Sequence, residues 1–271
     1  MTLKKRRLGR TEMLVSELGL GAMDTPHSPE AFETVIAALD AGIDVVDTAR
    51  DYEGSEHLLG RVVRERGSEG WHIASKTFRH TASAAQYEID RSLQVLGVPH
   101  VALYQLHDIS TPAAWDEVMR EDGALAGLKA AQYRGLVAHI GISTHNLEVA
   151  RAAILSGEFD TIMLEYSAFY PESAPLIDLA AAHDIGVIVM RPVGGSGRTT
   201  TMRGNIERGT AGILTPANLL RYVLSNPNVS VAIPGARYRS RVVENAATAS
   251  RYLPMTAAEK HELELAAAAL Y

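Results

Sequence analysis

The sequence contains no cysteine, few aromatic residues and no long apolar run. Without cysteine the chain can form no disulfide, no thiolate-ligated zinc site and no iron–sulfur cluster, so redox chemistry would need a bound organic cofactor. Only four Phe and two Trp occur among 271 residues, so an aromatic-lined pocket is not obvious. No segment approaches the roughly 20 apolar residues of a membrane span, and no stretch of signal-peptide length follows the start. We therefore expect no membrane association, a cytoplasmic location and no metal site.

An excess of positive charge is also missing. The formal net charge is -6 and the isoelectric point is near 5.9. This balance argues against a surface for nucleic acid or anionic membrane, because both need basic patches. The short basic segment Lys4–Arg7 is typical of a solvated first strand.

The chain does contain a regular alternation of short apolar segments and helical patterns. In one helical pattern Ser28 and Pro29 can begin the helix, and Gly42 can end it. Such alternation predicts parallel strands joined by right-handed helical crossovers, and one barrel of this kind needs about 250 residues. We expect residues 1–271 to form one α/β domain, a (β/α)8 TIM barrel. Its wall strands are predicted at Glu17–Leu20, Asp44–Asp47, His72–Lys76, Ala102–His107, Ala138–Ser143, Thr161–Glu165, Val187–Met190 and Val229–Ile233.

Two segments depart from this alternation. The segment RRLGRTEMLVSEL predicts a β-hairpin that turns at Gly9–Arg10 and closes the bottom of the barrel. The stretch from Pro192 to Gly212 carries six glycines among polar positions and is predicted to be a long loop. Two interpretations stay open for it, a flexible flap over a phosphate-bearing ligand and a disordered connection. A self-contained barrel without an extra arm is expected to be a monomer.

Ionisable residues end three of the predicted strands. Asp47 closes IDVVD, Lys76 closes WHIASK 29 residues later, and His107 closes VALYQLH after a further 31 residues. Each spacing matches one strand, one helix and their loops, so the three side chains should meet at one rim. Tyr52 follows Asp47 in the segment DTARDYEGSE. Taken singly, Asp47 could cap a turn and His107 could be an ordinary rim histidine.

Together the four residues have a chemical logic. A tyrosine has an ordinary pKa of about 10 and is a poor proton donor at neutral pH unless a nearby cation stabilises its phenolate. Lys76 could provide that cation, and Asp47 could hold the ammonium group in a buried ion pair. Neutral His107 could donate a hydrogen bond to a carbonyl oxygen. The set therefore predicts a site that reduces a carbonyl group.

These residues lie in segments that resemble the aldo-keto reductase superfamily over nearly the whole chain. The similar segments, in family order, are RRLGRTEMLVSELGLGAM, DTARDYEGSE, ASKT, LYQLHD, HIGIST and VAIPGARYRSRVVEN. The resemblance implies a barrel that binds NADPH across its C-terminal rim, and the lack of a G-x-G-x-x-G turn agrees with this. It also implies that Tyr52 protonates the alkoxide formed from a small carbonyl substrate. In that scheme Lys76 and Asp47 tune Tyr52, and His107 positions the oxygen.

The resemblance also implies contacts to the adenosine end of the cofactor. Arg241, Glu244 and Asn245 keep the family spacing Arg-x-x-Glu-Asn, in which the arginine faces the adenosine phosphate and the other two contact adenine. Gly235 and Arg237 lie just before them, and Arg237 could add a second cation. Because the guanidinium fork suits a phosphate better than a diol, we expect NADPH rather than NADH.

At the nicotinamide end the sequence departs from the commonest family pattern. Ser143 and Thr144 stand where many members have Ser-Asn, and Met163 stands where they have Gln. Met190 or Arg191 takes the place of a stacking aromatic residue. A thioether or a guanidinium can lie against a ring, but these changes leave the choice between NADP and NAD open.

The substrate depends on rim loops that the sequence constrains little. Phe78, two residues after Lys76, is the candidate pocket residue, and the resemblance suggests a small or medium aldehyde, an α-dicarbonyl or a sugar-like carbonyl. Three alternatives stay open: oxidation of a sugar or alcohol with NAD(P)+, a regulatory NADPH-binding subunit, and a lyase that forms a Schiff base on Lys76. The order of the similar segments favours the reductase over the lyase.

Overall fold

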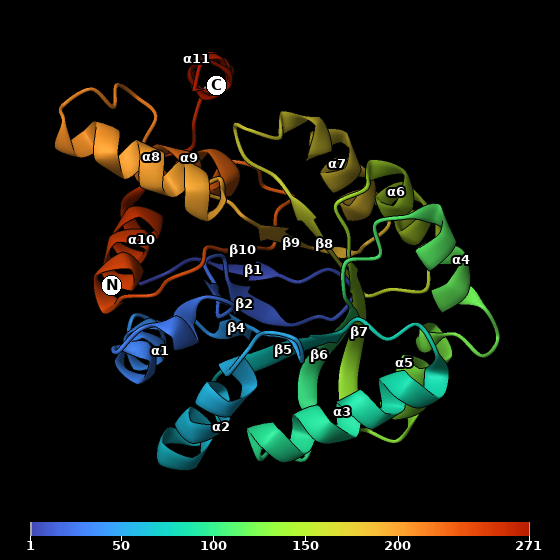
Figure 1. The fold of residues 1–271 in the computed structure, drawn as a ribbon. Helices are drawn as coiled ribbons and strands as arrows, with labels where there is room; N and C mark the ends of the chain where they lie inside the picture. Colours follow the sequence, from blue (N-terminus) through green and yellow to red (C-terminus); the bar gives the residue numbers. More distant parts are fainter. Residues whose placement is uncertain (1, 271) are drawn as a thin grey trace.

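The computed structural model describes residues 2–270, which form eight parallel strands in a nearly closed barrel (Figure 1). The ring is completed by main-chain hydrogen bonds from Gly19 N to Ala232 O, 2.8 Å, and from Gly21 N to Pro234 O, 3.1 Å. Around the barrel the strands are β3 Leu20–Gly21, β4 Val45–Asp47, β5 His72–Thr77, β6 Val101–Leu106, β7 Val137–Ser143, β8 Thr161–Glu165, β9 Gly186–Met190 and β10 Val231–Ile233. The predicted (β/α)8 barrel is confirmed.

Helices cover the outside of the barrel and alternate with the strands (Figure 1). They are α1 Ala31–Asp40, α2 Ser55–Arg66, α3 Ala82–Leu96, α4 Pro112–Met119, α5 Ala124–Tyr133, α6 Leu147–Ser156, α7 Ala174–Ala182, α8 Gly195–Glu207, α9 Pro216–Leu224, α10 Arg239–Arg251 and α11 Ala257–Ala268. Side chains of Thr111, Asn146 and Thr215 cap the first turns of α4, α6 and α9. Across residues 2–270, no helix has the length and apolar character needed to cross a membrane.

The interior of the barrel is set by the alternation of side chains along each strand. Val45, Ala74 and Leu103 belong to an interior apolar cluster, and Leu8 and Val15 join it from the segment before the barrel. A separate and larger apolar layer lies between the strands and the helices. Side chains two residues apart on a strand point to the same face. The residue two positions after each member of this cluster therefore also points into the barrel, nearer the C-terminal end of the strand.

The predicted N-terminal hairpin is confirmed. Strands β1 Lys5–Arg7 and β2 Leu14–Ser16 pair antiparallel, and the turn between them follows Gly9. The amide of Arg10 donates to the carbonyl oxygen of Asp184, 2.7 Å away and just before β9. The hairpin therefore closes the N-terminal end of the strands, here called the bottom rim.

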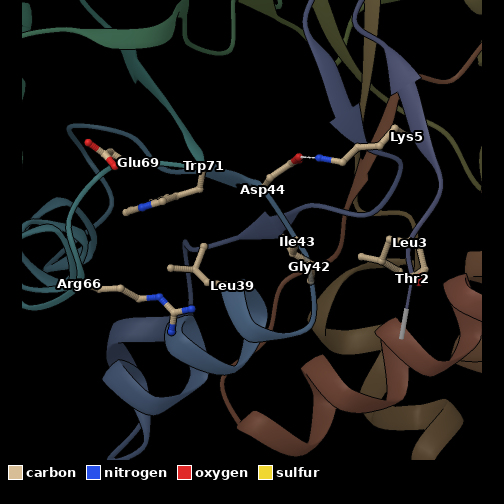
Figure 2. Close-up of a pocket in the computed structure, with 11 residues that line it drawn as sticks. Thr2, Leu3, Lys5, Leu39, Gly42, Ile43, Asp44, Arg66, Glu69 and Trp71 are labelled. Carbon is tan, nitrogen blue, oxygen red and sulfur yellow. Dashed lines mark hydrogen bonds and ion pairs between the residues drawn. The ribbon is translucent and has the colours of Figure 1, made fainter.

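A cavity of about 350 Å³ lies beside the hairpin at the bottom rim (Figure 2). The Lys5 ammonium bonds to Asp44 across it, and Arg66 forms an ion pair of 2.6 Å with Asp40. Its lining residues are Thr2, Leu3, Lys5, Leu39, Gly42, Ile43, Asp44, Arg66, Glu69, Gly70 and Trp71. Two of the cations near this cavity are thus already held by carboxylates of the protein.

The stretch from Pro192 to Gly212 is not the long loop predicted from its glycines, because α8 occupies most of it. The prediction was wrong because it took every glycine as a loop position, although Gly197 and Gly204 lie within the helix. Gly194 and Gly209 have φ values of +89° and +71° and turn the chain into and out of the helix. Between them, buried Met202 anchors α8 to the rest of the protein.

Candidate active site

Three buried polar side chains lie inside the barrel, directly above the interior apolar cluster on the side of the C-terminal strand ends. Asp47 ends β4, Lys76 is the penultimate residue of β5, and Gln105 is the penultimate residue of β6. Each is two residues beyond a member of the interior cluster and therefore points inward. All three are buried. The meeting of Asp47 and Lys76 at one rim, expected from the strand spacing, is observed at the C-terminal ends of the strands, here called the upper rim.

Lys76 occupies the centre of this group. Its ammonium, which is 0% exposed, donates to Asp47 Oδ1 at 2.6 Å and to the carbonyl oxygen of Thr48 at 2.8 Å. Burial raises the pKa of Asp47, and the charge of Lys76 opposes that effect. Because a buried ammonium is costly without partners, these acceptors hold Lys76 in place.

Tyr52 lies on the loop between β4 and α2. Its hydroxyl is 3.4 Å from Lys76 Nζ and 3.4 Å from His107 Nε2. Burial raises the pKa of Tyr52, and the nearby charge of Lys76 only partly opposes this. Tyr52 is therefore protonated at neutral pH. Both contacts are long for hydrogen bonds, so the hydroxyl is free to bond a further atom.

His107 follows β6 and lies against the same hydroxyl. Burial, together with the charges of Lys76 and His145, lowers the pKa of His107 to about 3, so its ring is neutral at physiological pH. The ring of Phe78 stacks on it with centroids 3.9 Å apart. Nδ1 of His107 is buried and has no hydrogen-bond partner among residues 2–270. The structure thus brings Phe78 next to His107.

This arrangement can act on one oxygen atom. The Tyr52 hydroxyl and His107 Nε2 are close enough that both can contact the same oxygen of a ligand. The tyrosine can supply a proton, and the neutral imidazole can supply a second hydrogen bond. The Phe78 ring, 42% exposed, adds an apolar wall beside them.

Ser143 and Thr144 lie at the end of β7, and both are buried. Ser143 Oγ accepts a hydrogen bond from the amide of Asp108 at 2.9 Å and donates to Leu106 O at 3.4 Å. Thr144 Oγ1 accepts from the amide of Asn146 at 3.0 Å. The bond that Ser143 donates is long, so its hydroxyl can turn toward another acceptor.

Met163 and Met190 supply apolar surface at the same end. Met163 pairs in register with Ser143 and is buried in the interior cluster. Met190 ends β9 and packs partly buried against that cluster. The two flexible thioether side chains can therefore provide an apolar contact surface for a flat ring.

Arg191 follows Met190 with a φ of +50° and an exposed side chain. Its Nη1 lies 2.7 Å from Glu165 Oε1, and His145 Nδ1 lies 2.6 Å from the same oxygen. Burial raises the pKa of Glu165, but the bond from His145 and the charge of Arg191 hold it below its ordinary value. Sequence reasoning missed Glu165 and His145. Their position at strand ends was the available signal.

The residues predicted for the adenosine end lie together around the start of α10. Arg241, Glu244 and Asn245 are within the first two turns of that helix, and Arg241 Nη1 lies 2.9 Å from Glu244 Oε1. Gly235 and Arg237 lie in the exposed segment just before it. The residues predicted from the sequence for the adenosine end therefore lie on one part of the surface.

A further arginine reaches this surface from α8. Arg203 Nη2 lies 3.2 Å from Glu244 Oε2, so Glu244 lies between Arg203 and Arg241. Arg237 Nη2 lies 3.5 Å from Asp24 Oδ1. Sequence reasoning missed Arg203 because it placed the whole segment in a loop. Arg203 and Arg241 therefore share one carboxylate, and Arg237 lies two residues before α10.

The described residues fit the cofactor that the sequence resemblance implies. Exposed Arg237 and half-buried Arg241 provide the cationic forks that a phosphate monoester needs. Ser143 can turn its hydroxyl to a carboxamide, and Met190 offers apolar surface for the ring. Across residues 2–270 no group of His, Asp or Glu is arranged to hold a metal ion.

The chain is similar in sequence to known oxidoreductases. The family model described as the Aldo/keto reductase family matches residues 17–212. The Bacillus subtilis protein YqkF, named an uncharacterized oxidoreductase, is 25% identical over 287 residues, with 90% of each chain covered. The NADH-specific methylglyoxal reductase of Escherichia coli is 25% identical over 222 residues, which cover 69% of this chain and 66% of that protein.

Solved structures resemble the fold closely. The holo form of the aldo-keto reductase AKR11C1 from Bacillus halodurans has a TM-score of 0.82 at 22% identity, covering 98% of this chain and 96% of its own. An aldo-keto reductase from Klebsiella pneumoniae, solved in complex with NADPH, has a TM-score of 0.78 at 22% identity, covering 98% and 95%. Because the family model also spans most of the sequence, the chain belongs to the aldo/keto reductase family of oxidoreductases.

Proposed function

We propose that this protein reduces an aldehyde or ketone to an alcohol with NADPH, and that Tyr52 is the proton donor. The observation that carries the proposal is the position of the Tyr52 hydroxyl, 3.4 Å from both Lys76 Nζ and His107 Nε2. The name of the NADH-specific methylglyoxal reductase supports carbonyl reduction, and the Klebsiella pneumoniae structure solved with NADPH supports the cofactor.

The side chains of the upper rim act on the carbonyl oxygen. When bound, NADPH supplies the hydride that reduces the carbonyl carbon. His107 is neutral and donates a hydrogen bond from Nε2, which orients the oxygen and polarises the carbonyl. The Tyr52 hydroxyl gives its proton to the same oxygen as negative charge develops there. Lys76 then stabilises the phenolate of Tyr52 by its positive charge.

Asp47 fixes the position of Lys76, because its Oδ1 lies 2.6 Å from Lys76 Nζ. The Lys76 nitrogen is fully buried and held by two acceptors, so it is poorly placed to attack a substrate carbonyl. This observation argues against the Schiff-base lyase that the sequence left open.

For the adenosine end we assign the phosphate to Arg241, with Arg203 and Arg237 as further cations. Glu244 and Asn245 would contact the adenine. A guanidinium fork favours a phosphate over a diol, which supports NADPH. The NADH-specific relative makes NADH the alternative, and the affinities for the two cofactors decide between them.

For the nicotinamide end we assign Ser143 and Thr144 to the carboxamide. Met163 and Met190 would lie against the ring, and Arg191 would border it from its ion pair with Glu165. The Phe78 ring, stacked on His107, would form one wall of the substrate pocket. We therefore propose a small carbonyl compound as the substrate.

The experiment is NADPH consumption with methylglyoxal and a panel of aromatic and sugar aldehydes, with identification of the product. We expect at least one alcohol to form in proportion to the NADPH consumed, and NADPH to bind more tightly than NADH. Binding without turnover in either direction would instead favour a regulatory subunit. Turnover only of an alcohol with NAD(P)+ would make the protein a dehydrogenase, and a borohydride-trapped adduct on Lys76 would make it a lyase.

A further inference from the structure

A buried carboxylate on α2 connects the loop that carries Tyr52 with the strand that carries Lys76. Glu56 is 3% exposed. Its Oε2 forms an ion pair of 2.5 Å with Arg50, two residues before Tyr52, and its Oε1 accepts a hydrogen bond of 2.6 Å from Ser75, one residue before Lys76. We propose that Glu56 is a positioning residue that sets the separation of the Tyr52 hydroxyl and Lys76 Nζ. The proposal rests on the reduction proposed above.

The alternation along β5 explains why Glu56 can hold this strand. Lys76 points into the barrel, so Ser75 points outward, toward the helices. There Ser75 is fully buried, and a buried hydroxyl needs a hydrogen-bond partner. Glu56 supplies it. Since the two residues are adjacent in one strand, the bond to Ser75 also fixes Lys76 relative to α2.

The ion pair of Glu56 with Arg50 holds the loop that carries Tyr52. The amide of Arg50 donates to the carbonyl oxygen of Lys76 at 3.0 Å, which holds the first half of the loop to β5. The amide of Tyr52 bonds within the loop itself, to Ala49 O at 3.2 Å. The Arg50 side chain adds a bond from this loop to Glu56 on the helix that follows. One carboxylate thus holds both segments that meet at the Tyr52 hydroxyl.

The reactive contacts are sensitive to such positioning. A separation of 3.4 Å is at the outer limit of a hydrogen bond, so a small shift of the loop changes its strength. A misplacement of about 1 Å caused by a distant change can lower a rate about 10²-fold. Glu56 touches no reacting atom, and its effect on the rate passes through Tyr52.

The chain offers a matched control on α3. Glu88 is also buried, at 7% exposed, and its two oxygens accept hydrogen bonds from Thr77 Oγ1 and, at 2.9 Å, from Arg79 Nε. Like Glu56, it joins a β5 hydroxyl and an arginine to a helix. Like Ser75, Thr77 is a neighbour of Lys76 in β5, but neither partner of Glu88 belongs to the loop that carries Tyr52. The loss of Glu88 should therefore cost similar stability and remove a similar contact to the strand, without moving the tyrosine.

The test compares Glu56→Ala, Glu56→Gln and Glu88→Ala in protein labelled with carbon-13 at the tyrosine ζ carbons. The Tyr52 signal is identified by its absence from Tyr52→Phe. We expect Glu56→Ala to shift this signal and to lower kcat about 10²-fold, with the dissociation constant of NADPH unchanged. Glu56→Gln should restore both, because its amide can accept from Arg50 and donate to Ser75. Glu88→Ala should leave both unchanged.

A double variant separates positioning from general damage. In the Tyr52→Phe background, Glu56→Ala should cost no further rate, because the group that it positions is gone. An unmoved Tyr52 signal in Glu56→Ala, or an equal loss of kcat in Glu88→Ala, would overturn the proposal. If Glu56→Ala does not fold, Arg50→Met breaks the same ion pair and takes its place. If the unchanged protein reduces no carbonyl, the proposed function fails, and the carbon-13 signals alone still decide whether Glu56 positions Tyr52.

Discussion

The two rims of the barrel both hold buried charges, but they differ in what lies beside those charges. At the bottom rim, Arg6 forms five hydrogen bonds of 2.6 to 2.9 Å, to Glu17, to three main-chain carbonyl oxygens and to the hydroxyl of Tyr252. Asp44 accepts bonds from the amide and hydroxyl of Ser16 at 2.7 and 2.8 Å and also holds Lys5 (Figure 2). These groups have short bonds to partners within the protein.

At the upper rim Lys76 also has short bonds, of 2.6 and 2.8 Å, whereas the Tyr52 hydroxyl beside it has only two long contacts of 3.4 Å. The hydroxyl therefore keeps capacity for a further hydrogen bond. In the described part of the chain a buried polar atom without a partner occurs at each rim, Glu17 Oε1 below and His107 Nδ1 above, so such atoms do not distinguish the rims. The bonded charges of the bottom rim serve the fold, whereas the tyrosine of the upper rim is free to contact a substrate.

Lys76→Met should have the largest effect at the upper rim. Removing the ammonium leaves Asp47 buried without its cation, which should lower the free energy of unfolding by about 3–5 kcal/mol. It also takes away the charge that opposes the raised pKa of Tyr52, so kcat should fall about 10³-fold. Denaturant unfolding and NADPH consumption measure the two effects. Adding Asp47→Leu should recover stability but no rate; recovery of the rate would contradict the account.

Arg6→Met is the counterpart at the bottom rim. It leaves Glu17, which is fully buried, without its cation, and should lower the free energy of unfolding by about 3 kcal/mol. Because Arg6 lies at the rim opposite Tyr52, kcat should be unchanged under conditions where the variant is folded. Urea unfolding and steady-state kinetics on one sample test this. A large loss of kcat with normal stability would break the comparison between the rims.

His107 should give the upper rim a pH-dependent stability. Its pKa is about 3 in the folded protein, and burial is the main cause, against about 6.5 in the unfolded chain. Between these values the unfolded chain binds more protons, so stability falls as pH drops through this window, by up to about 1.4 kcal/mol per pH unit. His107→Gln should remove that share of the slope in unfolding experiments from pH 4 to 6. An unchanged slope would mean that the imidazole is not held neutral.

Arg241→Ala should have the smallest of these effects. Losing one charge-assisted contact to the adenosine phosphate should raise the dissociation constant of NADPH about tenfold. The constant for NADH, which lacks that phosphate, should stay the same, and kcat at saturating NADPH should be little changed. Fluorescence titration with both cofactors measures this, with Arg203→Ala as a second variant of the same sign. An equal loss for both cofactors would remove Arg241 from the phosphate site.

Much of the barrel could be predicted because its strands are short apolar runs of regular spacing. The bounds of β8 agree at both ends, and those of β9 differ by one residue. The first wall strand is the least accurate, since residues before Leu20 bond to the β10 segment through isolated bridges rather than a ladder. Regular spacing also brought Asp47, Lys76 and His107 to one rim, because parallel strands all end there.

What the sequence could not supply were contacts between side chains of distant segments. Glu165 pairs with both His145 and Arg191 because the chain segments at the ends of β7, β8 and β9 reach the same height at the upper rim. The bonds of Glu56 to the tyrosine loop and to β5 depend on which strand face meets α2. Neither leaves a periodic signal, because each involves single polar residues in otherwise ordinary helical or loop patterns.

The most direct test of the account is the kcat of Tyr52→Phe compared with that of the unchanged protein, with a carbonyl substrate and saturating NADPH. The substitution removes one hydroxyl and leaves the barrel, Lys76 and the cofactor contacts intact. We predict a loss of about 10²- to 10⁴-fold in kcat with the dissociation constant of NADPH unchanged. Equal turnover by the two proteins would contradict the assignment of Tyr52 as the proton donor.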